Sequence, residues 1–146
     1  MTATLSTAMR FAPWLMAASA GVLLLFGTAH LVFTFHGPKF DPRDPQLKAL
    51  MQQVSPVISR EMTMWQAWIG FNASHSYGAM LYGTVYGYLA LWHPDFLFQS
   101  WFLLALGLVL MGGLVFLGHV YWFSTPYRGI LLASALYLAA LVLHFS

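Results

Sequence analysis

The sequence predicts an all-α integral membrane protein: an antiparallel four-helix bundle with a short interfacial amphipathic helix in the first loop. Of its 146 residues, 60% are hydrophobic and only 7% are charged, whereas soluble domains carry about 25% charged residues. About twenty apolar residues cross a bilayer core, and all charged residues lie at the ends of four such runs or outside them. The six tryptophans fall near the ends of the runs, as in an interfacial aromatic belt. The predicted spans of this single transmembrane domain are residues 13–36, 65–91, 97–122 and 127–145.

The first run has the pattern of an uncleaved transmembrane helix rather than a signal peptide. Arg10 precedes it, and Gly27-Thr28-Ala29 has the small residues of a cleavage site. The apolar run nevertheless continues through residues 31–35, which makes it long enough to cross a bilayer.

The connections between the runs indicate the topology. Two of them are short, around Pro94 and Pro126, and short links place consecutive helices antiparallel. The first connection is longer, and its Asp44-Pro45 pair has the pattern of an N-cap followed by a first helical residue. Apolar residues then recur on one helical face, which predicts an amphipathic helix over residues 45–54. This helix lies either in the plane of the interface or packed over the mouth of the bundle.

The distribution of lysine and arginine predicts the orientation. Loops one and three hold five of the six basic residues, and the opposite side holds Arg10. We therefore expect these two loops in the cytoplasm and both termini outside. The basic residues are too few and scattered to bind nucleic acid, so the expected partner is the lipid bilayer. The absence of cysteine excludes disulfides, thiolate catalysis and cysteine metal sites.

Small residues recur at four-residue intervals in the second run. Gly70, Ser74 and Gly78 form one series, and Gly83 and Gly87 repeat the spacing. Small residues at this interval let helix backbones approach closely in a membrane. We therefore expect the second helix to pack closely on a neighbour through these five positions.

The polar side chains of the second run are the main candidates for a functional site. Asn72, His75 and Ser76 share a helix face, and a polar side chain at membrane depth usually faces a bundle interior or a site. At a rise of about 1.5 Å per residue, His75 lies about 10–15 Å from the interface and His30 about 9 Å. The histidine of the third run, His119, lies about 6 Å deep. These side chains are predicted to meet in the leaflet that faces loops one and three.

Three interpretations of this group remain open. Neutral histidine and asparagine side chains can hydrogen-bond across helices and hold them together. Imidazole also binds transition metals and haem iron, for which His30, His75 and His119 would be the ligands. In the third interpretation His75 acts as an acid or base on a proton or a lipid-like substrate, and Asn72 orients that substrate. His75 and Asn72 are therefore the catalytic candidates.

The pattern W-x-x-W-x-G-F-N-x-S-H over residues 65–75 resembles a family of uncharacterised bacterial four-helix membrane proteins. Gly27-x-x-His30 fits the same pattern. The resemblance implies the four-helix architecture and a bacterial inner membrane as the location, but no activity. Length and topology alone are also similar to those of the membrane enzymes of eicosanoid and glutathione metabolism. Those enzymes bind anionic glutathione with several arginines, where this chain has only Arg60 and Arg128 near the membrane.

The expected function is that of a small multi-pass membrane protein with an intramembrane histidine and asparagine pocket. That pocket would bind a small ligand, a metal or haem for a redox or lipid-linked step. The alternative is a non-enzymatic subunit or assembly factor of a larger membrane complex. In that case the same residues only hold helices together, and the glycine-lined faces dock onto other membrane subunits or a second copy of the chain.

Overall fold

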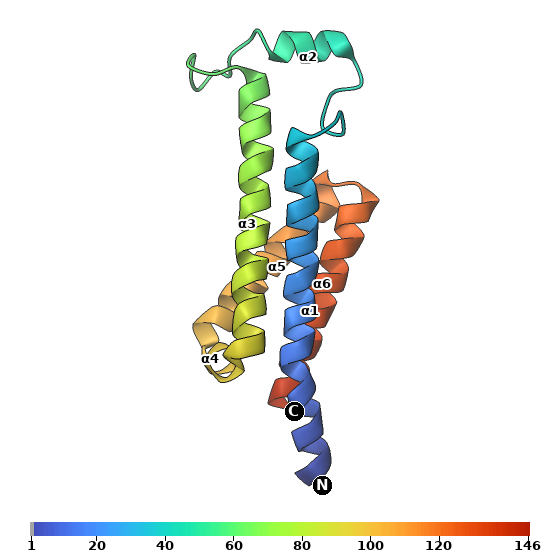
Figure 1. Cartoon of the computed structure of the whole chain (residues 1–146), viewed down its shortest axis with the longest axis vertical. Coiled ribbons are helices and arrows are strands. Elements are labelled where there is room, and N and C mark those ends of the chain that lie inside the picture. The colour runs from blue at the N-terminus through green and yellow to red at the C-terminus, as the bar shows by residue number, and fades with distance from the viewer. Residues whose placement is uncertain (1) are drawn as a thin grey trace. The chain divides into compact units, whose positions relative to one another are not determined.

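The computed structural model describes residues 2–146 of the chain, with side chains from Arg10 onward. The described chain is built from helices, without a β-strand (Figure 1). The all-α prediction is therefore confirmed. The helices are α1 Thr2–Phe35, α2 Pro45–Met51, α3 Met64–Trp92, α4 Pro94–Gln99, α5 Trp101–Tyr121 and α6 Ser124–Phe145.

Three of these helices are long and apolar enough to cross a membrane, namely α1 from Arg10 onward, α5 and α6. α3 has 29 residues, yet it is not among them. Asn72, His75 and the serines and tyrosines of α3 lower its mean hydropathy, although it contains no charged residue. The fourth span of the predicted bundle therefore stays a prediction.

The segment predicted as a third span over residues 97–122 consists of parts of two helices. α4 ends at Gln99, and Ser100 has an extended backbone with φ −90° and ψ 94°. Ser100 Oγ accepts a hydrogen bond from the Leu103 amide at 3.3 Å, so this side chain caps the start of α5. Hydropathy does not reveal the break, because apolar residues continue on both sides of Ser100.

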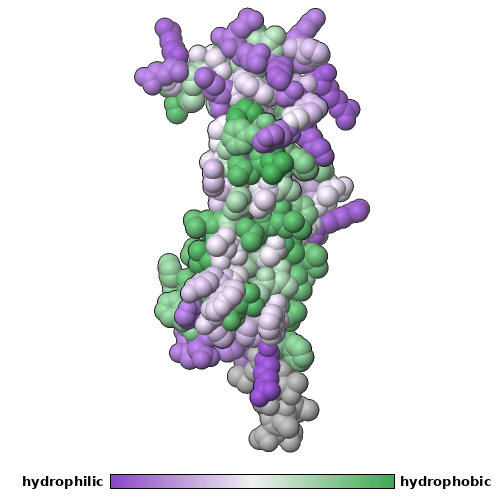
Figure 2. Space-filling model, viewed as in Figure 1, coloured by the Kyte–Doolittle hydropathy of each residue, from purple (hydrophilic) through white to green (hydrophobic). Residues whose placement is uncertain are grey.

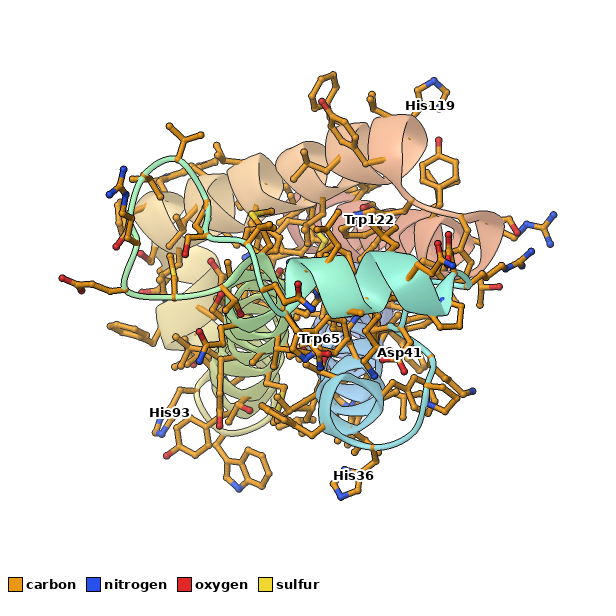
Figure 3. All side chains as sticks on the ribbon, turned by 90° about the horizontal axis from the view of Figure 1, so that it is seen from above. His36, Asp41, Trp65, His93, His119 and Trp122 are labelled. Carbon is orange, nitrogen blue, oxygen red and sulfur yellow. The ribbon has the colours of Figure 1, made fainter. Side chains whose placement is uncertain are left out.

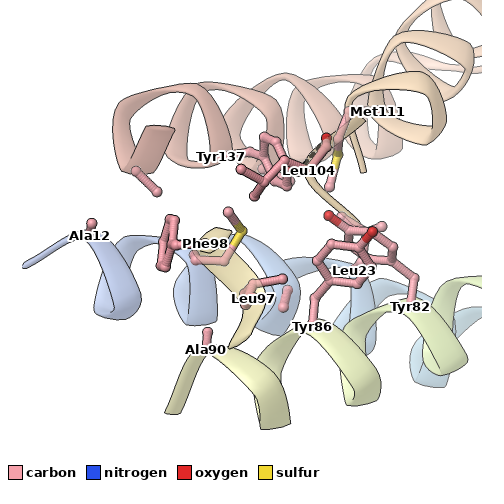
Figure 4. Packing of buried hydrophobic residues seen from close by; sticks show 14 of the residues in the cluster. Ala12, Leu23, Tyr82, Tyr86, Ala90, Leu97, Phe98, Leu104, Met111 and Tyr137 are labelled. Carbon is pink, nitrogen blue, oxygen red and sulfur yellow. Dashed lines mark hydrogen bonds between the residues drawn. The ribbon is translucent and has the colours of Figure 1, made fainter. Parts of the chain in front are cut away.

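The contacts divide the chain into two compact units. The first unit combines the chain up to residue 26 with residues 80–146, and the second unit holds residues 27–79. α1 and α3 thus each contribute one part to each unit. The first unit contains the hydrophobic core, in which Leu23 and Tyr137 are almost fully buried (Figure 4).

In the first unit, Gly83 brings α3 close to the backbone of α1. A Cβ atom built at Gly83 would lie 2.7 Å from the Ala20 carbonyl oxygen and 2.7 Å from the Leu24 nitrogen. Gly87 lies one turn further on, where a Cβ atom would meet the Ala20 Cβ at an ordinary 3.7 Å. The expected close packing through small residues is therefore present at these two positions.

The other half of the small-residue series does not pack in this way. A Cβ atom built at Gly70 or Gly78 would meet no atom of the described structure within 4 Å, and Ser74 between them is exposed. Residues nine positions apart lie on opposite faces of a helix of 3.6 residues per turn, as Ser74 and Gly83 do. Within this chain, close packing through the small residues is therefore present at Gly83 and Gly87, and for the other three positions it stays a prediction.

Buried polar side chains of the first unit donate hydrogen bonds to helix carbonyl oxygens. Ser19 Oγ donates to the Ala133 carbonyl at 2.7 Å, which links α1 to α6. Tyr86 Oη of α3 donates to the Leu103 carbonyl at 2.7 Å. Tyr137 Oη of α6 donates to the next carbonyl along α5 at 2.9 Å. Directional contacts thus link α1 to α6, α3 to α5, and α6 to α5, in addition to the apolar packing of this unit.

The outer faces of these helices are apolar. Large side chains such as Trp101, Phe102 and Val109 of α5 are exposed, and α5 contains no charged residue. A contiguous surface of this kind is unfavourable in water and suits the hydrocarbon region of a bilayer.

We predict that Gly83→Ala destabilises the protein because the new methyl group meets backbone atoms of α1 that cannot turn aside. The expected loss is about 1–3 kcal/mol of unfolding free energy, measured by thermal unfolding in detergent. Gly78→Ala on the same helix is the matched control, since a Cβ atom there meets nothing within 4 Å. Equal stability of the two variants would contradict the close approach of the two helices.

Candidate functional site

The candidate site lies in the second unit, where the end of α1 lies beside the first turns of α3 (Figure 1). Asn72 is the best-buried of the catalytic and ligand candidates, with 6% of its surface exposed. Its Nδ2 donates a hydrogen bond to the Trp68 carbonyl of the preceding turn at 2.8 Å. Only the amide nitrogen of the side chain can donate to a carbonyl, so this bond fixes which way the carboxamide points.

His30 bonds to the other end of the same carboxamide. Its Nε2 lies 3.0 Å from Asn72 Oδ1. Because Oδ1 is only an acceptor, Nε2 donates in this bond. The pair is a directional cross-link between α1 and α3.

His75 lies one turn further along α3 and is half-buried. Its ring meets the His30 ring edge to face, with 5.4 Å between centroids and 69° between planes. The two serines beside it bond to their own helix: Ser74 Oγ donates to the Phe71 carbonyl and Ser76 Oγ to the Asn72 carbonyl, both at 2.9 Å. Both hydroxyl hydrogens are therefore engaged within α3.

Loop one covers the cluster through Phe40. The Phe40 ring lies 4.5 Å from the His30 ring, centroid to centroid, and the Phe40 carbonyl accepts a hydrogen bond from Trp68 Nε1 at 3.1 Å. Trp68 thus bonds to loop one through its indole N–H and to Asn72 through its backbone carbonyl. The sequence assigned Trp68 only to an interfacial belt, and no pattern indicated the part played by Phe40.

Thr34 is a second residue that the sequence did not single out. It is 6% exposed, and its Oγ1 donates to the His30 carbonyl at 2.8 Å. The spacing of four residues is the only sequence signal for this bond, which is the usual one for a threonine within a helix.

α2 follows the predicted pattern, although it ends at Met51 rather than at residue 54. Asp44 Oδ1 accepts a hydrogen bond from the Gln46 amide at 2.8 Å, as expected of its N-cap. Lys48 Nζ lies 2.8 Å from Asp41 Oδ2 and 4.8 Å from the centre of the Trp65 ring. No residue of α2 is buried, and hydrophilic residues gather over α2 and its flanking loops (Figure 2).

The structure brings together three of the predicted site residues, namely His30, Asn72 and His75. His119 belongs to the first unit, where it is exposed and its ring lies 5.9 Å from that of Tyr127. Its side chain points away from the helices, as do those of His36 and His93 (Figure 3).

The cluster does not have the composition of a metal centre. Within the part of the chain that the structure describes, no three side chains of the histidine, cysteine, aspartate and glutamate types gather as a metal-binding group. Structural zinc sites use four protein ligands, and catalytic ones three. A haem iron takes one or two histidines, but His30 would first have to release Asn72 from its Nε2 or bind through Nδ1.

No protein-family model matches this chain, and neither does any curated protein or solved structure. The candidate site is therefore inferred from the contacts within this chain alone.

We predict that Trp68→Phe loosens loop one, because the variant loses the indole N–H that donates to the Phe40 carbonyl. Hydrogen exchange of the Asp41 amide, which bonds to the Pro38 carbonyl at 3.1 Å, should become roughly two- to tenfold faster. Trp14→Phe is the control, because Trp14 is an exposed tryptophan of the first unit. Equal exchange in both variants would contradict the role of the indole.

Proposed function

We propose that this chain is a non-enzymatic integral membrane protein, a structural subunit or assembly factor of a larger membrane complex. The observation that carries the proposal is the His30–Asn72 hydrogen bond together with the Asn72 bond to the Trp68 carbonyl. The carboxamide oxygen and one of the two amide hydrogens that would orient a substrate are bonded within the protein. In such a cluster the polar groups hold helices together.

The proposal includes four spans, with α3 as the additional one. At about 1.5 Å per residue, the 29 residues of α3 extend about 43 Å, more than the roughly 30 Å of a hydrocarbon core. α3 packs on α1 through Gly83, and its polar Asn72 and Ser76 are buried while Phe71, Tyr77 and Leu81 are exposed. This distribution is that of a helix with its polar face toward a partner and its apolar face toward lipid.

The proposed orientation places loops one and three in the cytoplasm of a bacterium and both termini on the far side of its inner membrane. Lys39, Arg43 and Arg60 are exposed in loop one, where they meet the anionic surface of a cytoplasmic leaflet. A helix packed over the mouth of a bundle would bury one face. Because α2 buries no residue, we propose that it lies in the interface plane.

The exposed half of the small-residue series supports the subunit proposal. Gly70, Ser74 and Gly78 present a smooth stripe on α3 that the chain itself leaves uncovered. Transmembrane helices of other subunits, or of a second copy, associate through stripes of this type.

A double-mutant cycle tests the structural role of the cluster. We predict that His30→Ala and Asn72→Ala each lower the unfolding free energy in detergent by roughly 0.6–2 kcal/mol. The double variant should lose less than the sum of the two, because each single change already removes the shared hydrogen bond. His119→Ala is the control and should change stability little, since His119 is exposed. Strict additivity of the two changes would contradict the proposal.

A ligand site at His75 is the second candidate, and the edge-to-face approach of the His75 and His30 rings favours it. The experiment is a visible absorption spectrum and metal analysis of the protein purified gently from its native membrane. A Soret band or stoichiometric metal that is lost in His75→Ala would favour this candidate over the non-enzymatic proposal. A colourless and metal-free protein would exclude haem and metal as the ligand.

A further inference from the structure

Tyr82 is a buried tyrosine of the first unit, and its hydroxyl group makes no hydrogen bond within the described structure. The residue is 7% exposed, and its ring stacks on that of Tyr86 with 4.1 Å between centroids and 23° between planes. Among the described residues, Tyr82 Oη is the one buried side-chain oxygen or nitrogen that lacks a hydrogen-bond partner.

Two neighbouring tyrosines, in contrast to Tyr82, do form hydrogen bonds through their hydroxyl groups. Tyr86 Oη and Tyr137 Oη both donate to carbonyl oxygens at the start of α5, at 2.7 and 2.9 Å. Figure 4 shows Tyr82 and Tyr86 projecting from α3 into the packed region where Leu104, Met111 and Tyr137 lie. Two of the three tyrosine hydroxyls of this core therefore have a hydrogen-bond acceptor, and the Tyr82 hydroxyl has none.

A buried hydroxyl without an acceptor lowers stability, since it loses its bonds to water on folding and gains none. The great majority of buried polar groups are paired, with protein or with a bound molecule. A phenylalanine at this position would fill the same space without that cost. The hydroxyl is thus placed to donate to an acceptor that does not belong to the chain.

We propose that Tyr82 Oη donates a hydrogen bond to an oxygen atom of a neutral molecule bound within the core of the first unit. The molecule is neutral because the residues of this core carry no charged side chain, and an unpaired charge buried among them would be strongly unfavourable. Two sources supply such an oxygen: an internal water molecule, and the carbonyl group of a lipid-soluble compound.

The sign of the stability change in Tyr82→Phe tests this site. If Oη is paired with a bound molecule, Tyr82→Phe lowers the melting temperature of the protein purified from native membranes, by about 2–4 °C. Tyr86→Phe is the matched control, because it removes a neighbouring hydroxyl with a known partner and should give a fall of similar size. An unchanged or higher melting temperature in Tyr82→Phe, alongside a fall in Tyr86→Phe, would overturn the proposal.

Native mass spectrometry of the same samples separates the two sources. A small molecule that is bound to the unmodified protein and lost in Tyr82→Phe would identify a lipid-soluble carbonyl compound. A lower melting temperature without any bound organic mass would identify an internal water. Both readouts are independent of the His30–Asn72 cluster, so the proposed function and this site succeed or fail separately.

Discussion

Helix carbonyl oxygens are the acceptors on which this structure depends. A chain with only 7% charged residues has few ion pairs with which to fix its helices, and apolar packing alone is not directional. A carbonyl already bonded within its helix keeps a second lone pair. Such an oxygen accepts a hydrogen bond from each of Ser19, Asn72 and Tyr137. These bonds offset the free-energy cost of burying a polar side chain.

The two units use this acceptor differently. In the first unit, the donors reach across to another helix: Ser19 to α6, and Tyr86 to α5. In the second unit, Thr34 and Ser76 donate back to their own helix, so these bonds satisfy the side chain without joining two elements. In the second unit, the His30–Asn72 bond joins α1 to α3, and the bond of Trp68 joins α3 to loop one.

The sequence predicted what depends on composition and periodicity. Low charge and long apolar runs indicate the helical class, and the four-residue spacing of Asn72 and Ser76 indicates their shared buried face. Matched depth predicted that His30, Asn72, His75 and His119 meet, and the structure brings the first three together. Periodicity does not reveal a contact between distant segments such as Trp68 and Phe40, because that contact depends on the path of loop one. Periodicity places Gly83 and Gly78 on different faces of α3, but it does not reveal which of these faces meets α1.

The bond between Ser19 and Ala133 joins residues 114 positions apart, and this separation has a consequence for biosynthesis. Chains are made from the N-terminus, so α1 is complete long before Ala133 has been synthesised. Until then the Ser19 hydroxyl must bond elsewhere, most simply to the carbonyl one turn back in its own helix. Docking of α1 onto the last helix therefore exchanges one carbonyl partner for another, and it completes the core only after translation has reached the final helix.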